Sequence, residues 1–334
     1  MVKTEDILID NWGRKINYLR IAITDRCNLR CFYCMPEEGI NYLPKKELLS
    51  YEELLRLARI VAELGVNKIR LTGGEPFIRR DVMSFLSKLN QTSGIDSIHI
   101  TTNGVFTHKY LNDLQGVGIK SVNLSMDTLD PVKFKQITRR DEFHNVEKTL
   151  YGLLERNIPT KVNMVVMEGQ NIDDIVPMVE LSKNHPVEVR FIEEMPFNGD
   201  ALHHVALTWN HKRILQTIQN VYPETNSIAH DSNSTSLRYH IDGFKGNFGI
   251  IPAYSRTFCN TCNRLRITSQ GTIKTCLYDD GVLDLKKSLR NGDSDQVIKN
   301  QLRTVVGKRA RDGFEAEKTR KILTINESMS SIGG

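Results

Sequence analysis

Residues 18–34 read YLRIAITDRCNLRCFYC, an apolar run followed by a loop with three cysteines spaced C-x3-C-x2-C. Thiolates at this spacing can converge on one centre, because the intervening residues let the backbone wrap around a soft metal or an iron-sulfur cluster. A zinc site would normally close with a fourth Cys or His, and only a distant residue such as His99 could supply it. A four-iron cluster held by Cys27, Cys31 and Cys34 would instead leave one iron open. An open position indicates a reactive centre rather than a structural one.

Strands and helices alternate after this loop. Residues 50–65 begin with the capping box of Ser50 and Glu53 and carry apolar residues at helical spacing, which predicts a helix. Strands are expected at 18–24, 66–72, 96–102, 119–125, 160–166 and 187–193. Six βα units predict an α/β fold with a parallel sheet, either doubly wound or an incomplete barrel of the (βα)8 type.

The pattern changes after residue 197, where a stretch rich in His, Asn and Ser begins. We therefore predict two domains, 1–197 and 198–334, the second a smaller α+β domain. Its segments SLRYHI, GNFGII, RLRIT and GTIKTC look like strands of one small antiparallel layer, with helical segments near 208–221 and 283–306.

Composition narrows the classes of function. The 334 residues are 40% hydrophobic with a net charge of +5, a mildly basic balance that suits an anionic small molecule but lacks the concentrated patch of nucleic-acid binders. No apolar run reaches the ~20 residues of a membrane helix, and the first residues lack a secretory signal. We expect no nucleic acid, no membrane and a cytoplasmic location.

A second cysteine trio, Cys259, Cys262 and Cys276, is spaced C-x2-C-x13-C and again lacks a fourth ligand. A structural zinc completed by a distant histidine is one interpretation, and a second iron-sulfur cluster is the other. Arg264 and Arg266 stand two apart on an expected strand, so both point to one face beside this trio. Paired guanidiniums suit a substrate with phosphate or carboxylate groups.

Four further cations lie inside the expected strands: Arg20, Arg70, Lys161 and Arg190. Buried unpaired charges are costly, so a barrel lumen that holds an anion would explain them together. Individually, each could also be a solvated or salt-bridged residue.

The loop CNLRCFYC, followed by GGEP after the second strand, resembles the signature of the radical S-adenosylmethionine (SAM) superfamily. The resemblance implies that the six units form an incomplete (βα)6 TIM-like barrel. It also implies that the open iron binds the amino and carboxyl groups of SAM and that Gly73, Gly74 and Glu75 lie against its methionine part. Taken alone, GGEP would also suit a plain turn before a helix.

Over nearly the whole chain the resemblance narrows to the GTP 3′,8-cyclase family of molybdenum cofactor biosynthesis. It rests on LRIAITDRCNLRCFYCMP, IRLTGGEPFIRRD, TTNG, KVNMVV, VRFIEEMP, FCNTCNRLRIT and the terminal GG. It implies SAM contacts from Tyr33, Gly74, Ser125 and Met195, and GTP contacts from Arg20, Arg70, Thr101, Lys161, Arg190, Arg264, Leu265 and Arg266. It also implies that Gly333 and Gly334 insert toward the active site, where catalysis would depend on them and on Arg20, Arg264 and Arg266.

The activity implied is that of a lyase with two 4Fe-4S clusters. One reduced cluster splits SAM, the 5′-deoxyadenosyl radical takes hydrogen from C3′ of GTP, and C3′ then bonds to C8. One further electron and a proton convert this radical adduct to (8S)-3′,8-cyclo-7,8-dihydroguanosine 5′-triphosphate. An external one-electron reductant and cyclic pyranopterin monophosphate synthase, which takes the product, are the implied partners. The sequence leaves the oligomeric state open, a homodimer included. A peptide-modifying radical SAM enzyme and a non-catalytic zinc or redox module are the alternatives.

Overall fold

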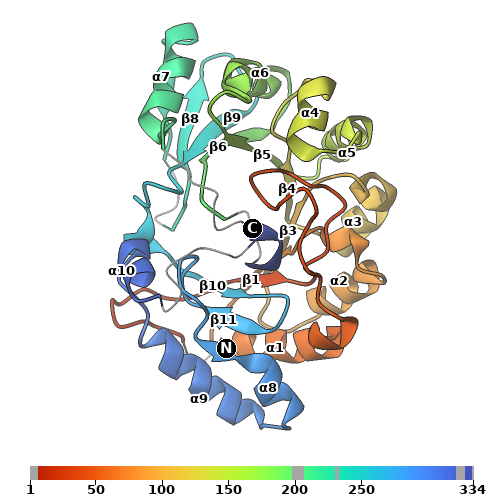
Figure 1. Cartoon of the computed structure of the whole chain (residues 1–334), viewed down its shortest axis with the longest axis vertical. Coiled ribbons are helices and arrows are strands. Elements are labelled where there is room, and N and C mark those ends of the chain that lie inside the picture. The colour runs from red at the N-terminus through yellow and green to blue at the C-terminus, as the bar shows by residue number, and fades with distance from the viewer. Residues whose placement is uncertain (1–6, 198–206, 230–232, 321–327, 333–334) are drawn as a thin grey trace.

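The computed structural model describes residues 7–197, 207–229, 233–320 and 328–332 (Figure 1). Six consecutive parallel strands form its centre. They are β1 (Tyr18–Ala22), β2 (Lys68–Thr72), β3 (Ser97–Thr102), β4 (Ser121–Ser125), β5 (Thr160–Val166) and β6 (Glu188–Glu193). Each lies within or at the ends of its predicted segment, so the sequence-based prediction of six βα units is confirmed.

Helices connect these strands along the outside of an open ring of strands (Figure 1). They are α1 (Tyr51–Glu63), α2 (Val82–Asn90), α3 (Leu111–Val117), α4 (Pro131–Thr138), α5 (Phe143–Glu155) and α6 (Ile175–Asn184). The helix predicted from the capping box is α1, in which Ser50 Oγ accepts from the backbone of Glu53 and the Glu53 carboxylate accepts from Ser50. Leu54, Leu57 and Val61 of α1 are fully buried and pack its inner face onto the sheet.

The C-terminal strands extend both edges of the same sheet. On one edge, β9 (Asn247–Ile251) pairs parallel with β6 and leads to β8 (Leu237–Ile241) and β7 (Thr225–Ser227). On the other, β10 (Arg264–Ile267) pairs parallel with β1 and leads to β11 (Thr272–Lys274) and β12 (Leu283–Asp284). The prediction of one separate antiparallel layer is therefore wrong, because each group of strands satisfies the open hydrogen-bonding edge of β1 or β6 instead.

The remaining helices of the described residues are α7 (His211–Val221), α8 (Leu285–Arg290), α9 (Asp295–Val306), α10 (Gly313–Lys318) and α11 (Met329–Ile332). Short 3-10 turns occupy Lys45–Glu47, Pro76–Ile78, Thr107–Tyr110, Ile172–Asp174 and Cys259–Thr261. Thus α7, α8 and α9 confirm the predicted helical segments. In Figure 1, α11 lies inside the ring of strands rather than among the outer helices.

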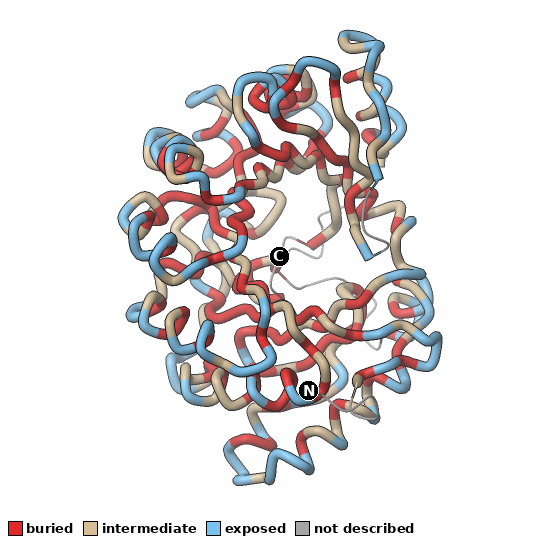
Figure 2. The backbone as a smooth tube through the Cα atoms, turned by 180° about the vertical axis from the view of Figure 1, so that it is seen from behind, coloured by how far each residue is buried: buried red, intermediate tan, exposed pale blue. Residues whose placement is uncertain are grey.

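Buried backbone follows the strands and the inner faces of the helices, and exposed backbone follows the outer surface (Figure 2). Two large hydrophobic clusters lie between the sheet and the helices, one beneath α1 to α3, the other beneath α4 to α7. The predicted domain boundary adjoins residues 198–206, which lie outside the described part, and stays a prediction. No helix in the described part of the chain has the length and apolar character needed to cross a membrane.

Candidate active site

A cavity of about 860 Å³ occupies the inside of the ring of strands. This volume falls within the roughly 300–1,000 Å³ that is usual for small-molecule sites. Residues of all six central strands line the cavity, together with all six cysteines of the chain. The two trios, more than 220 residues apart in the sequence, therefore face one cavity.

The first trio lies on the loop after β1, where the Arg30 guanidinium donates to the Cys27 carbonyl at 2.8 Å. Burial, with the negative charge of Glu75, raises the pKa of the Cys27 thiol from 9.0 to about 11. Burial and the neighbouring Cys27 raise that of Cys34 to about 12, and the pKa of Cys31 is also raised. Three soft donors that repel one another as thiolates fit a cationic metal cluster, which would stabilise all three charges together.

The glycines of GGEP hold this loop in place. Gly74 N donates to the Thr24 carbonyl at 2.9 Å, and Glu75 N donates to the Arg26 carbonyl at 2.8 Å. A Cβ atom at position 74 would lie 2.2 Å from the Arg26 carbonyl oxygen, so only glycine permits this approach. Gly73, at a φ of 144°, likewise lies against Thr24.

Glu75 lies behind the cavity wall rather than in it. Its fully buried carboxylate accepts hydrogen bonds from the backbone of Phe77 at 3.0 Å and of Asn103 at 2.7 Å, and from Thr102 Oγ1 at 2.9 Å. Burial raises its pKa from 4.5 to about 7. The side chain thus joins the GGEP turn to the end of β3, a role that the sequence did not indicate.

The other predicted SAM contacts, Tyr33, Ser125 and Met195, all line the cavity. Tyr33 Oη donates to Asp127 Oδ2 at 2.8 Å, and the second carboxylate oxygen of Asp127 accepts from the backbone of Val165 at 2.8 Å. Burial raises the pKa of Asp127 from 3.8 to about 6. Asp127 therefore fixes the position of the motif tyrosine from the end of β4, a contact that sequence analysis missed.

The predicted arginines gather where β10, β1 and β2 lie side by side. Strand register places Arg266, Arg20 and Arg70 at one level and Arg264, Tyr18 and Lys68 at the next. Burial and repulsion from Arg266 lower the pKa of Arg20, and its Nε has no hydrogen-bond partner among the described residues. An orphaned, buried cationic donor beside further guanidiniums fits an anionic ligand.

Tyr18 lies among these cations. Its hydroxyl accepts a hydrogen bond from Arg70 Nε at 2.6 Å, and Arg264 lies 5.5 Å from its ring centroid. Burial alone would raise the pKa of Tyr18, but the charges of Arg70, Arg20 and Arg264 outweigh it and lower the pKa from 10.0 to about 7.

Lys161 and Arg190 lie on the opposite wall and are ion-paired. Both contact the buried Glu188, at 3.1 Å from Lys161 Nζ and 2.5 Å from Arg190 Nε, and Arg238 approaches it at 3.6 Å. Burial, with repulsion from Arg190, lowers the pKa of Lys161 from 10.5 to about 8. For these two cations the salt-bridge interpretation is confirmed, and Glu188 was missed because no motif marks it.

Two other predicted GTP contacts, Thr101 and Leu265, differ in whether their side chains reach the cavity. Thr101 lines the cavity, and its hydroxyl oxygen lies 3.4 Å from Arg70 Nη1. The Leu265 side chain is fully buried in the hydrophobic cluster beneath α1, so only its backbone is available to a ligand.

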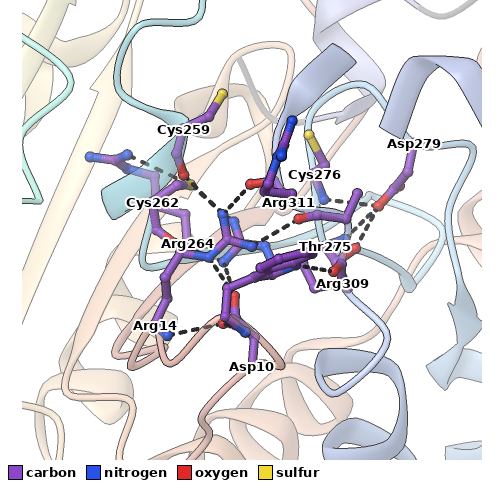
Figure 3. Close-up of polar contacts among 12 residues, drawn as sticks. Asp10, Arg14, Cys259, Cys262, Arg264, Thr275, Cys276, Asp279, Arg309 and Arg311 are labelled. Atoms are coloured by element: carbon purple, nitrogen blue, oxygen red, sulfur yellow. Dashed lines mark hydrogen bonds and ion pairs between the residues drawn. The ribbon is translucent and has the colours of Figure 1, made fainter. Parts of the chain in front are cut away.

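The second trio comes together from the turn Cys259–Thr261, the residue after it, and the loop after β11 (Figure 3). Asp279 supports Cys276 by accepting from its backbone N–H at 2.8 Å and from that of Thr275 at 2.8 Å. Burial alone would raise the pKa of Cys262, but the charges of Arg309 and Arg264 outweigh it and lower the pKa from 9.0 to about 7. This trio thus differs from the first in having cations beside its sulfur atoms.

Among the residues that the structure describes, no three His, Cys, Asp or Glu side chains are placed to hold a single metal ion. The predicted Gly333 and Gly334 lie outside the described residues. The segment just before them docks at the first trio, where Ser328 Oγ donates to the Cys34 carbonyl at 2.7 Å. Met329 and Ser330 line the cavity.

A parallel βα ring whose first loop carries C-x3-C-x2-C, packed against a GGEP turn, defines a radical SAM protein. Residues 21–182 match the family model described as "Radical SAM superfamily", and residues 187–314 match "Molybdenum Cofactor Synthesis C". GTP 3′,8-cyclase of Syntrophomonas wolfei is 41% identical over 333 residues, which cover 95% of this chain and 99% of that protein. The chain belongs to the GTP 3′,8-cyclase family.

The mitochondrial GTP 3′,8-cyclase of Arabidopsis thaliana is 38% identical over 98% of this chain and 84% of its own length. Human molybdenum cofactor biosynthesis protein 1 is 42% identical over 91% of this chain but only 48% of its own length. The chain thus spans about half the length of the animal relatives. The crystal structure of Streptococcus suis SuiB bound to S-adenosylmethionine has a TM-score of 0.59 at 16% identity, covering 85% of this chain and 68% of that one, and shares the fold.

Proposed function

We propose that this chain catalyses the cyclisation of GTP to (8S)-3′,8-cyclo-7,8-dihydroguanosine 5′-triphosphate, the first step of molybdenum cofactor biosynthesis. The observation that carries the proposal is the single cavity that both cysteine trios and the cations of β1, β2 and β10 line together. Relatives named GTP 3′,8-cyclase that match nearly the whole chain support the same activity.

Cys27, Cys31 and Cys34 would hold the first four-iron cluster and leave one iron open for SAM. Cys259, Cys262 and Cys276 would hold a second cluster with an open iron toward the substrate. When bound, the first cluster supplies the electron that splits SAM into methionine and a 5′-deoxyadenosyl radical, which takes hydrogen from C3′ of GTP. The protein's own part is to bind, orient and enclose the reactants.

Arg20, Arg70 and Arg266 would bind the triphosphate, because their guanidiniums lie at one level of three neighbouring strands and together suit a multivalent anion. Lys161 and Arg190 would exchange part of their pairing with Glu188 for substrate oxygens. The walls of the cavity would limit the access of water and oxygen to the reacting carbon.

Tyr33, positioned by Asp127, and the backbone of Gly73 and Gly74 would contact SAM near the first trio. The roles of Gly333 and Gly334 beside the substrate remain predictions, supported by the docking of Ser328 at Cys34.

The proposal includes an external one-electron reductant and transfer of the product to cyclic pyranopterin monophosphate synthase. Six free cysteines suit a reducing compartment such as the cytoplasm. Whether two copies of the chain form a homodimer stays an open question. The alternative of a peptide-modifying enzyme is less well supported, because SuiB shares only 14–16% identity with this chain and its likeness is one of fold.

Anaerobic reconstitution with iron and sulfide, followed by incubation with GTP, SAM and a reductant, tests the proposal. We expect about eight irons per chain, from two four-iron clusters, and a cyclised nucleotide. Cys27→Ala should lose SAM cleavage, since one of only three anchors is removed. Formation of 5′-deoxyadenosine by that variant at the wild-type rate would contradict the assignment of the first trio as the ligands of the cluster that splits SAM.

Arg264→Ala and Arg266→Ala should retain uncoupled SAM cleavage but weaken GTP binding by about 10- to 100-fold, the loss expected for one hydrogen bond to a charged group. Arg80→Ala is the matched control, because the Arg80 side chain is 94% exposed at the surface. Wild-type product yield from either cavity variant would count against the substrate site.

A further inference from the structure

The guanidinium of Arg309 contacts the second cysteine trio directly. Arg309 follows α9, and its side chain is only 3% exposed. One terminal nitrogen donates to the Cys262 carbonyl at 2.7 Å, and the other donates to Cys262 Sγ at 3.0 Å. Two donations from one planar group fix both the backbone and the sulfur of this cysteine.

A buried carboxylate holds the guanidinium from the other side. Asp10 lies in an N-terminal hairpin closed by the bridge between Ile9 and Lys15, and its side chain is fully buried. Its Oδ2 lies 3.6 Å from Arg309 Nη1 and accepts from Arg14 Nε at 2.6 Å. One carboxylate therefore serves two arginines.

Arg14 then ties the hairpin to the rest of the trio. Its guanidinium donates to the Cys259 carbonyl at 2.9 Å and to the Ala310 carbonyl at 2.8 Å (Figure 3). Trp12 Nε1 donates to the Arg309 carbonyl at 3.1 Å. Three segments far apart in the sequence, 8–16, 259–262 and 309–311, thus meet around two of the three cysteines.

The balance of charge around Arg309 points to its role. Asp10 is shared with Arg14, so two buried guanidiniums face one carboxylate, and the other side-chain acceptor of Arg309 is the Cys262 sulfur. Hydrogen bonds to ligating sulfurs help set the reduction potentials of iron-sulfur clusters, and outer-shell groups fix the orientation of ligands. Among the described residues, the donors to sulfur at the first trio are neutral groups, such as the Asn103 amide, 3.5 Å from Cys27 Sγ.

We propose that Arg309 is a positioning residue that holds Cys262 and raises the reduction potential of the cluster on the second trio, with Asp10 and Arg14 holding Arg309 in place. The inference rests on the proposed second cluster. Adding an electron increases the negative charge near the sulfurs, so a cationic donor there stabilises the reduced form. The second cluster is thereby distinguished electrostatically from the first.

The test uses the 334-residue chain with Cys27, Cys31 and Cys34 all changed to Ala, so that only the second trio carries a cluster. Reductive titration is followed by electron paramagnetic resonance, and iron per chain is counted in parallel. Arg309→Met should shift the reduction equilibrium toward the oxidised cluster by about tenfold, which equals about 59 mV for one electron. Arg309→Lys, which keeps the charge, should shift it in the same direction by less.

Arg311→Met is the matched control, since that side chain is 65% exposed and lies two residues away, and its potential should not change. If Arg309→Met loses the cluster, Arg309→Lys at full iron content decides the question. An unchanged potential in an iron-replete Arg309 variant would overturn the inference and leave the proposed function standing. A background protein that binds no iron at the second trio would overturn the proposed second cluster and this inference with it.

Discussion

Replacing Gly74 by alanine should release the first cluster without unfolding the protein. The new Cβ would lie 2.2 Å from the Arg26 carbonyl oxygen and 2.5 Å from its carbonyl carbon, whereas real Cβ contacts are essentially never below 3.0 Å. The Arg26 carbonyl must therefore move by at least 0.8 Å. It cannot move freely, because it accepts a hydrogen bond from Glu75 N at 2.8 Å. Cys27 follows Arg26 directly, so the displacement passes to a cluster ligand.

Overpacking and one weakened hydrogen bond together cost about 2 to 4 kcal/mol. We expect Gly74→Ala to lower the free energy of unfolding by that amount in urea titration, and to hold about four rather than eight irons, since only the second trio keeps its geometry. SAM cleavage should fall with the first cluster.

Gly116→Ala is the matched control for this variant. Gly116 lies in α3, and a Cβ there meets no atom within 4 Å. The change should leave iron content unaltered and stabilise the helix by up to ~1 kcal/mol. A Gly74→Ala protein with full iron content and unchanged stability would refute the view that this close approach holds the cysteine loop.

Two further predictions concern buried carboxylates. Burial raises the pKa of Glu75 above its unfolded value of 4.5 to about 7, so the stability linked to its protonation is fully present below pH 4.5 and lost as the pH rises through 7. In the Glu75→Gln variant, the free energy of unfolding measured in urea should therefore vary by about 3 kcal/mol less across this pH range than in the wild type. The same pH profile in both proteins would contradict the raised pKa of Glu75. Glu188→Gln should free Lys161 and Arg190 from their ion pairs with Glu188. GTP binding, measured by equilibrium dialysis, should then become about fivefold tighter, which equals ~1 kcal/mol. Weaker binding would show that Glu188 positions these cations instead.

The sequence carries local signals for much of this architecture. The capping box at Ser50 and the alternation of strands and helices predict α1 and the six parallel strands, and the cysteine spacings predict both trios. The pairing of β9 and β10 was mispredicted because it depends on which sheet edges stay open, and no local pattern in a short strand encodes that.

The functional residues that sequence analysis missed were missed for the same physical reason. Asp10 and Arg309 meet across 299 positions of the sequence, and Glu188 is the first residue of a strand, outside any motif. Charge alone does not show which partner such a residue will find. Strand spacing, by contrast, correctly indicated that Arg264 and Arg266 share a face, and both line the cavity.

The most direct test of the central claim uses GTP deuterated at C3′ with the reconstituted protein, SAM and a reductant. If the cavity holds GTP with its ribose toward the first trio, deuterium will appear in 5′-deoxyadenosine, together with a cyclised nucleotide that has lost the label. Turnover of SAM to unlabelled 5′-deoxyadenosine, with all deuterium retained in GTP, would contradict the account.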